Sequence, residues 1–235
     1  MKAYILRTIE YRDTSRLLYA YTEDGVKSMI ARGVKKLQSP LGPLSQRGLL
    51  LEVDIGGGSL PTLKDAQLID RFAPIKEDIL KSTVLSTVEE LIYYNVHRDD
   101  AHERLFDFLM RYIDVLARTD APVELLLVFE LKFLWFLGAG VYLKACHVCD
   151  AKEGLHYDAH QGALVCDAHA PGNHKLYGKD IYGPLRYYYY ADINRFTPLH
   201  PGIDTISSLL GHTDALYRMH LGFRSKAKTI AKSLL

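Results

Sequence analysis

The sequence of 235 residues has few cysteines and no long apolar segment at its N-terminus. Its three cysteines cannot all pair within one chain, which argues against a disulfide framework and predicts a reducing, cytoplasmic setting. No apolar run of signal-peptide length follows Met1, so we expect no secretion signal. With 48% hydrophobic and 24% charged residues, the composition is that of a globular protein and excludes collagen-like and disordered classes.

The chain also lacks a membrane-spanning run that is free of charge. Its most apolar stretch, residues 123–143, contains Glu124, Glu130 and Lys132. Two central charges oppose insertion into a bilayer by roughly 2.5 to 3.5 kcal/mol each. We therefore interpret the stretch as a buried helix at the centre of a bundle and expect no membrane partner.

Charge of one sign is not in excess, because 29 basic residues face 28 acidic ones and the net charge is +1. The distribution is nevertheless uneven. Residues 1–36 contain eight basic and four acidic residues, and residues 215–235 contain five basic residues and no acidic one. Two positive ends therefore flank an acidic centre, and these ends are the segments that we expect to meet a polyanion.

The first 70 or so residues show the pattern of a small β-barrel, in which short aliphatic and tyrosine-rich runs alternate with turn residues. The predicted strands are Ala3–Tyr11, Ser15–Thr22, Val26–Arg32, Gly48–Ile55 and Thr62–Phe72. Five short strands with one early hairpin are typical of an OB-fold, although an SH3-like barrel has the same periodicity. Residues 1–76 are taken as this first domain.

Helical spacing of apolar residues begins after Pro74 and predicts a second domain over residues 77–235. Pro122 is placed in the first turn of the leucine-rich helix, which Gly138 ends. Further helices are predicted over 181–190 and 203–221. The predicted fold class is therefore α+β, with a five-stranded barrel followed by an all-helical domain that carries a small zinc-binding loop.

The zinc-binding loop is predicted from two cysteine knuckles, which lie in an insert at residues 144–171. Sixteen residues separate the Cys-x-x-Cys pair from the Cys-x-x-His pair, a spacing that suits a tetrahedral Zn²⁺ site. The predicted ligands are Cys146, Cys149, Cys166 and His169. Four protein ligands leave no open position, so the zinc would be structural. The alternatives are His147, His156 or His160 as the fourth ligand, or metal-free buried cysteines.

Catalytic signatures are missing from the sequence. We find no Gly-x-Ser-x-Gly elbow, no Walker-type phosphate loop and no His-Glu-x-x-His motif. The glycines at 56–58 lack the lysine and the helix start of a phosphate site and are interpreted as a turn. We therefore predict no enzyme and no small-molecule substrate. A zinc hydrolase would need an open zinc position and a carboxylate such as Asp158 or Asp167.

Basic residues lie in or beside the first three predicted strands and are interleaved with tyrosines. The basic residues are Arg12, Arg16, Arg32, Lys35 and Lys36, and the tyrosines are Tyr4, Tyr11, Tyr19 and Tyr21. Cations that track phosphates beside rings that stack on bases form a platform for single-stranded nucleic acid. Because strand residues alternate between faces, about half of these tyrosines should lie in the core. Solvated charges over a tyrosine-filled barrel are the competing interpretation.

A second basic cluster follows the last acidic residue, Asp214. Its members are Arg218, Arg224, Lys226, Lys228 and Lys232. They either extend a phosphate-binding surface or form the solvated face of a terminal helix. The four tyrosines at 187–190 are interpreted as helix packing, with a partner groove as the alternative.

Several separated segments together resemble the RecO family of bacterial recombination mediators. They include Tyr11-Arg12-Asp13-Thr14-Ser15, Ala31-Arg32-Gly33-Val34-Lys35-Lys36, Phe129-Glu130-Leu131-Lys132-Phe133-Leu134 and Gly222-Phe223-Arg224-Ser225-Lys226. The resemblance extends over nearly the whole chain, in the family's order. Many relatives with a zinc site have four cysteines, where this chain has His169 at the fourth position.

The resemblance implies an OB-fold, a helical domain and a function without catalysis. RecO-like proteins bind single- and double-stranded DNA, anneal complementary strands and help RecR to load RecA onto DNA coated by single-stranded DNA-binding protein (SSB). The resemblance assigns DNA contact to Arg32, Lys35 and Lys36. From the basic clusters we add four further predicted DNA contacts, namely Arg12, Arg16, Arg224 and Lys226. The resemblance also implies binding of the acidic SSB tail, which we assign to Arg218, Arg224 and Lys226, and a place at the bacterial nucleoid.

A zinc-containing RNA-binding or transcription-associated module is the alternative function. A barrel with a zinc loop does not by itself distinguish DNA from RNA.

Overall fold

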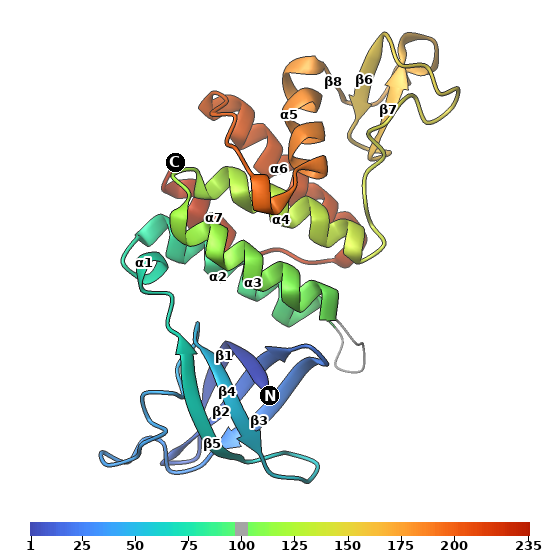
Figure 1. The fold of residues 1–235 in the computed structure, drawn as a ribbon. Coiled ribbons are helices and arrows are strands. Elements are labelled where there is room, and N and C mark those ends of the chain that lie inside the picture. The colour runs from blue at the N-terminus through green and yellow to red at the C-terminus, as the bar shows by residue number, and fades with distance from the viewer. Residues whose placement is uncertain (97–102) are drawn as a thin grey trace. The chain divides into compact units, whose positions relative to one another are not determined.

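The fold of the chain, as a computed structural model, is described for residues 1–96 and 103–235 (Figure 1). Internal contacts divide it into two units, Met1–Arg118 and Thr119–Leu235. Among the described residues, the first unit contains a five-stranded sheet and three α-helices, and the second contains four α-helices and a small sheet. The predicted α+β class, with an N-terminal sheet and a helical C-terminal region, is confirmed.

Five antiparallel strands build the first sheet in the order β3-β2-β1-β4-β5. They are β1 (Lys2–Tyr11), β2 (Ser15–Thr22), β3 (Gly25–Ala31), β4 (Leu50–Ile55) and β5 (Leu63–Asp70). The long β1 pairs with β2 over most of its length and with β4 near its start. A parallel bridge from Ile30 to Thr62 brings the two edge strands together, so the sheet curls on itself (Figure 1).

Small and aliphatic side chains of one parity fill the inside of this curled sheet. Ala3 and Ile5 of β1 belong to the same core cluster as Leu18 and Ala20 of β2, and all four are fully buried. Two of the predicted tyrosines have the opposite parity. Tyr4 and Tyr21 are fully buried as well, but they lie on the outer face of the sheet, where helices of the same unit cover them.

Three helices complete the first unit, and a buried carboxylate joins one of them to the sheet. They are α1 (Ala73–Lys76), α2 (Ile79–Asn95) and α3 (Glu103–Arg118). Glu89 of α2 accepts a hydrogen bond from the Tyr4 hydroxyl at 2.7 Å and pairs with Arg47 at 3.3 Å. Burial raises the pKa of Glu89 to about 7, because desolvation outweighs the stabilising Arg47 charge.

The second unit is built around α4 (Pro122–Phe136), which packs against α5 (Lys179–Tyr190) and α6 (Ile203–Leu221). α4 is apolar nearly all round and almost every side chain in it is buried, as expected of a central helix. Pro122 stands at its start and Gly138 follows its end with a positive φ. None of the helices within residues 1–96 and 103–235 combines the length and apolar character needed to cross a bilayer.

The expectation of an all-helical second domain is wrong in one place. A small sheet in the order β7-β6-β8 joins β6 (Leu155–Asp158), β7 (Ala163–Cys166) and β8 (Leu176–Tyr177). These strands have only two to four residues, too few for a period-two signal. All of β7 is buried, so alternation would not have revealed it either.

A buried ion pair fixes the C-terminal helix α7 (Lys226–Ser233) to the centre of the second unit. The Lys228 side chain is 2% exposed, and its Nζ lies 2.7 Å from Glu130 Oε1 of α4. The same Nζ lies 2.9 Å from Asp214 Oδ1 and donates to Thr213 Oγ1 at 2.7 Å. Lys232 also pairs with Asp214. Lys228 and Lys232 of the predicted basic cluster are therefore structural residues.

Lys228→Met is expected to destabilise the second unit by about 3–5 kcal/mol, because it leaves the Glu130 carboxylate buried without its cation. Denaturant unfolding followed by helix circular dichroism measures the change. Arg224→Ala, which removes an exposed cation just before the same helix, should stay within about 0.5 kcal/mol of wild type. Equal effects of the two substitutions would contradict this role for Lys228.

Glu89 predicts a pH dependence for the first unit. Its pKa is about 7 in the folded chain against an ordinary 4.5, so its contribution is most favourable below pH 4.5 and is lost as the pH rises through 7. Between pH 5 and 8 the wild type should lose about 2 kcal/mol of unfolding free energy relative to Glu89→Gln. Urea titrations of both proteins at the two pH values test this, and parallel pH profiles would refute it.

Candidate metal centre and nucleic-acid interface

The four predicted metal ligands come together in the second unit. The first knuckle turns at Asp150, whose φ of 59° closes a hydrogen bond from its N–H to the carbonyl of Cys146. The second pair follows at the end of β7, where Cys166 begins a short 3₁₀ turn over Asp167–His169. The hydrogen bond from His147 N–H to the Leu164 carbonyl holds the two halves together.

The ligand atoms have the spacing of a tetrahedral metal site. The sulfur atoms of Cys149 and Cys166 lie 3.7 Å apart, and His169 Nδ1 lies 3.2 Å from Cys166 Sγ and 3.9 Å from Cys146 Sγ. All four ligand atoms lie within 4.8 Å of one another. Zn²⁺ bound at 2.0–2.3 Å to each atom requires separations of this order. The donor set and the geometry therefore fit a closed structural zinc site.

The sulfur of Cys146 is prepared for the thiolate form. Burial alone would raise its pKa, but the backbone N–H groups of Val148, Cys166 and Cys149 lower it to about 6. A thiolate is the form that binds a metal.

Two of the three alternative histidine ligands, and both alternative carboxylates, have partners outside the group of four ligands. His156 Nε2 lies 2.7 Å from Asp167 Oδ1, and His160 packs against the ring of His174. Asp158 is buried and accepts hydrogen bonds from Gln161 and from backbone N–H groups, and His174 lies 2.7 Å from it. Within the described part of the chain, the group that gathers around the knuckles is Cys146, Cys149, Cys166 and His169. Neither carboxylate belongs to it.

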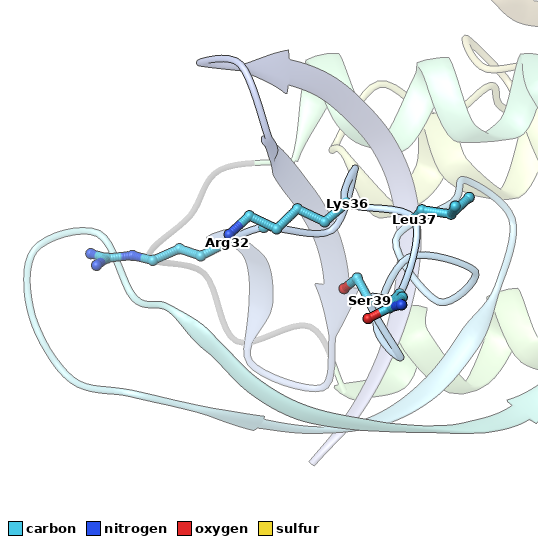
Figure 2. A pocket seen from close by; sticks show the side chains of 6 residues that line it. Arg32, Lys36, Leu37 and Ser39 are labelled. Carbon is cyan, nitrogen blue, oxygen red and sulfur yellow. The ribbon is translucent and has the colours of Figure 1, made fainter.

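In the first unit, a groove lies between the β1–β2 turn, the segment after β3 and the β4–β5 loop. We call it the barrel groove. Its two adjoining hollows measure about 890 and 550 Å³ and share Arg32, Gly33 and Lys36. Gly33 has a φ of 65°, and its N–H donates to Ser15 Oγ, which folds this segment back onto the turn. Figure 2 shows the side chains of Arg32 and Lys36 extending to the same side, away from Leu37.

The five predicted cations of this region fall into two groups. Arg12, Arg32 and Lys36 line the barrel groove and are exposed. Within residues 1–96 and 103–235, no carboxylate forms an ion pair with any of these three. Arg16 and Lys35 instead share Glu10, whose pKa is lowered chiefly by its hydrogen bond to Lys35. The lining of the groove therefore holds three cations without an ion pair, together with one exposed carboxylate, Asp13.

One of the four predicted tyrosines lines the barrel groove. Tyr11 is half-buried there, and the guanidinium of Arg12 lies 5.3 Å from the centre of its ring. Tyr19 packs edge-on against Tyr93 of α2 instead. With Tyr4 and Tyr21 buried, the predicted row of stacking rings is reduced to Tyr11.

Sequence reasoning missed the opposite wall of the barrel groove. Gly58, Ser59 and Leu60 line it, although the glycine run was interpreted only as a turn. The turn itself places these residues across from Arg12. The position of the loop between β4 and β5 could have indicated this wall. The residue types in the loop could not, because glycine, serine and leucine are not typical of a binding site.

The remaining members of the C-terminal basic cluster are exposed. Arg218 lies in the last turn of α6, Arg224 in the connection to α7, and Lys226 at the start of α7. The tyrosines at 187–190 divide in the same way as those of the barrel. Tyr188 is buried and donates to Glu124 at 2.8 Å, whereas Tyr190 is 48% exposed.

The chain matches known protein families over most of its length. The family described as "Recombination protein O N terminal" matches residues 1–72, and "Recombination protein O C terminal" matches residues 76–229. Proteins named "DNA repair protein RecO" from Bacillus cereus (strain AH187), Bacillus anthracis and Bacillus mycoides (strain KBAB4) are each 27% identical over 198 residues. Each match covers 81% of this chain and 79% of the relative.

Proposed function

The chain belongs to the RecO family of DNA repair proteins, and we propose on that premise that it is a non-catalytic recombination mediator. In this role it binds single- and double-stranded DNA, anneals complementary strands and assists RecR in loading RecA onto SSB-coated DNA. The proposal includes action at the nucleoid in the bacterial cytoplasm.

The observation that carries the DNA-binding part is the barrel groove. Its three cations have no ion pair among the described residues, and its aromatic ring is Tyr11. The order of the five strands and the bridge that closes the sheet support an OB-fold, in which the loops after the first and fourth strands flank the ligand. Phosphates would displace counterions from the cations, while an unstacked base would lie on the tyrosine ring.

Annealing follows from holding two strands near one another. When two strands are bound to one protein, the second encounter becomes intramolecular and the local strand concentration rises. In the second unit, Arg218, Arg224 and Lys226 are the proposed contacts to the acidic SSB tail, and Arg224 and Lys226 are also proposed contacts to DNA. Exposed charges at such a rim would act mainly on the association rate.

For the metal centre we propose a bound Zn²⁺ held by Cys146, Cys149, Cys166 and His169. The ion would supply a cross-link between the two knuckles, and four protein ligands leave no position for a reacting water. The alternative ligands His147, His156 and His160 would not be needed to bind the ion.

The triple variant Arg12→Ala/Arg32→Ala/Lys36→Ala tests the barrel groove. Three lost phosphate contacts should weaken binding of a single-stranded oligonucleotide by tenfold or more at low salt and reduce the slope of log affinity against log salt by about 2. Glu52→Gln/Asp54→Asn, which also alters charges on the barrel, serves as a folding control. An unchanged affinity and slope would refute the groove. A matched RNA oligonucleotide that binds more tightly than DNA would instead favour the RNA-binding alternative.

Metal analysis tests the zinc site. Protein purified without added metal should contain about one equivalent of zinc, and Cys149→Ser/Cys166→Ser should contain almost none. His147→Ala, in the same knuckle but outside the group of four, should keep its zinc. A wild-type content well below one equivalent after anaerobic purification would contradict the proposal.

A further inference from the structure

A second cationic surface lies in the second unit, beside the metal centre and apart from the residues assigned so far. A hollow of about 490 Å³ is lined by Tyr142, Lys144, Ala145, Asp150, Lys152 and Arg186. Lys144 and Lys152 flank the first knuckle, and Arg186 comes from α5. An adjacent hollow of about 400 Å³ shares Arg186 and continues along α5 past Tyr187 and Tyr190. We call these two hollows together the α5 surface.

The cations of the α5 surface have no structural partner. Lys144, Lys152 and Arg186 are all exposed, and no ion pair engages them within the part of the chain that the structure describes. Asp150 is the single carboxylate in the same lining. By contrast, Lys228 and Lys232 in the same unit are fully engaged by carboxylates. The α5 surface therefore retains a net positive charge that the fold itself does not use.

Two aromatic rings line the same hollows as these cations. Tyr142 is 39% exposed and Tyr190 is 48% exposed, so both rings are accessible from the solvent. The pKa of Tyr190 is raised by burial of part of its ring, an effect that the nearby Arg186 opposes. The hydroxyl-bearing rings of Tyr189 and Tyr190 meet edge-on at 5.0 Å, which holds Tyr190 in place.

We propose that the α5 surface is a second binding site for single-stranded nucleic acid. Three cations line the first hollow, and one of them, Arg186, also lines the second, an arrangement that suits a phosphate backbone. The two exposed rings suit unstacked bases. An acidic peptide would use the same cations, but it offers a planar ring only where it has an aromatic residue, whereas every base of a single strand has a face that can stack on an exposed ring. The inference shares with the proposed function only the class of ligand, because the barrel groove lies in the other unit.

The site supplies what annealing requires beyond the barrel groove. One strand bound in the groove and one bound at the α5 surface would be held on the same molecule, which raises their effective concentration. The two sites differ in composition, since the α5 surface has two exposed rings and the groove has one half-buried ring. Binding at the α5 surface should therefore depend more on base stacking.

The test uses the full chain and a dT oligonucleotide short enough to occupy one site. In the background of Arg12→Ala/Arg32→Ala/Lys36→Ala, the added pair Lys144→Ala/Arg186→Ala should reduce the residual affinity at low salt by about tenfold and the salt slope by about 1 to 1.5. The control pair Lys179→Ala/Arg195→Ala removes two exposed cations of the same unit outside both hollows and should change neither quantity.

The aromatic contribution is tested separately. Tyr142→Ala should weaken the residual binding about fivefold or more, whereas Tyr142→Phe, which keeps the ring, should bind as the parent does. Annealing of two naked complementary strands should fall in Lys144→Ala/Arg186→Ala even though the barrel groove is intact.

The outcomes separate this inference from the proposed function. If the groove variant loses all oligonucleotide binding while Lys144→Ala/Arg186→Ala binds and anneals as wild type, the α5 surface is refuted and the groove stands. If the groove variant binds normally and the α5 variant does not, the groove fails and the α5 surface stands. If Lys144→Ala/Arg186→Ala loses binding to an acidic, apolar peptide but keeps its affinity for the oligonucleotide, the α5 surface is a peptide site and the inference is overturned.

Discussion

Both units depend on carboxylates that are buried in helices and must be paired there. Glu89 in α2, Glu124 and Glu130 in α4 are each almost wholly buried. A buried carboxylate is strongly unfavourable unless hydrogen bonds and cations compensate for the lost water. The partners come from distant segments. Glu89 accepts a hydrogen bond from Tyr4 and pairs with Arg47. Glu124 accepts a hydrogen bond from Tyr188, and Glu130 pairs with Lys228. These pairs specify which segments meet, because an apolar contact alone would tolerate other arrangements.

The same requirement divides the cations of the chain into two kinds. A cation that compensates a buried carboxylate, such as Lys228, belongs to the fold and is not available to a ligand. Some cations without a carboxylate partner line hollows, as do Arg32 and Lys36 in the barrel groove and Lys144 in the α5 surface. A net charge of +1 therefore says little about polyanion binding, because compensation is local.

The sequence predicted what depends on local pattern and missed what depends on pairing across the chain. The five long strands and the central helix follow from apolar periodicity, and the metal ligands follow from cysteine spacing. The burial of Lys228 is invisible in a basic segment, because its buried partner Glu130 lies 98 residues away in α4. The small sheet escaped for another reason, since four-residue strands carry no measurable period. The α5 surface could not be predicted either, because Lys144 and Arg186 line one hollow only once the chain has folded.

The position of the metal centre also affects the α5 surface, because the two adjoin in the sequence. Lys144 and Lys152 lie two and three residues outside the first knuckle, and Asp150 within the hollow forms the knuckle's turn. A metal that fixes Cys146 and Cys149 would therefore also fix the backbone from which these two cations project. Two exposed lysines on a fixed backbone lose less conformational entropy on meeting a phosphate chain than two on a loose loop. A structural ion can thus shape a binding surface without touching the ligand. His169 would contribute to this effect as the fourth ligand, which completes the tetrahedral geometry of the site.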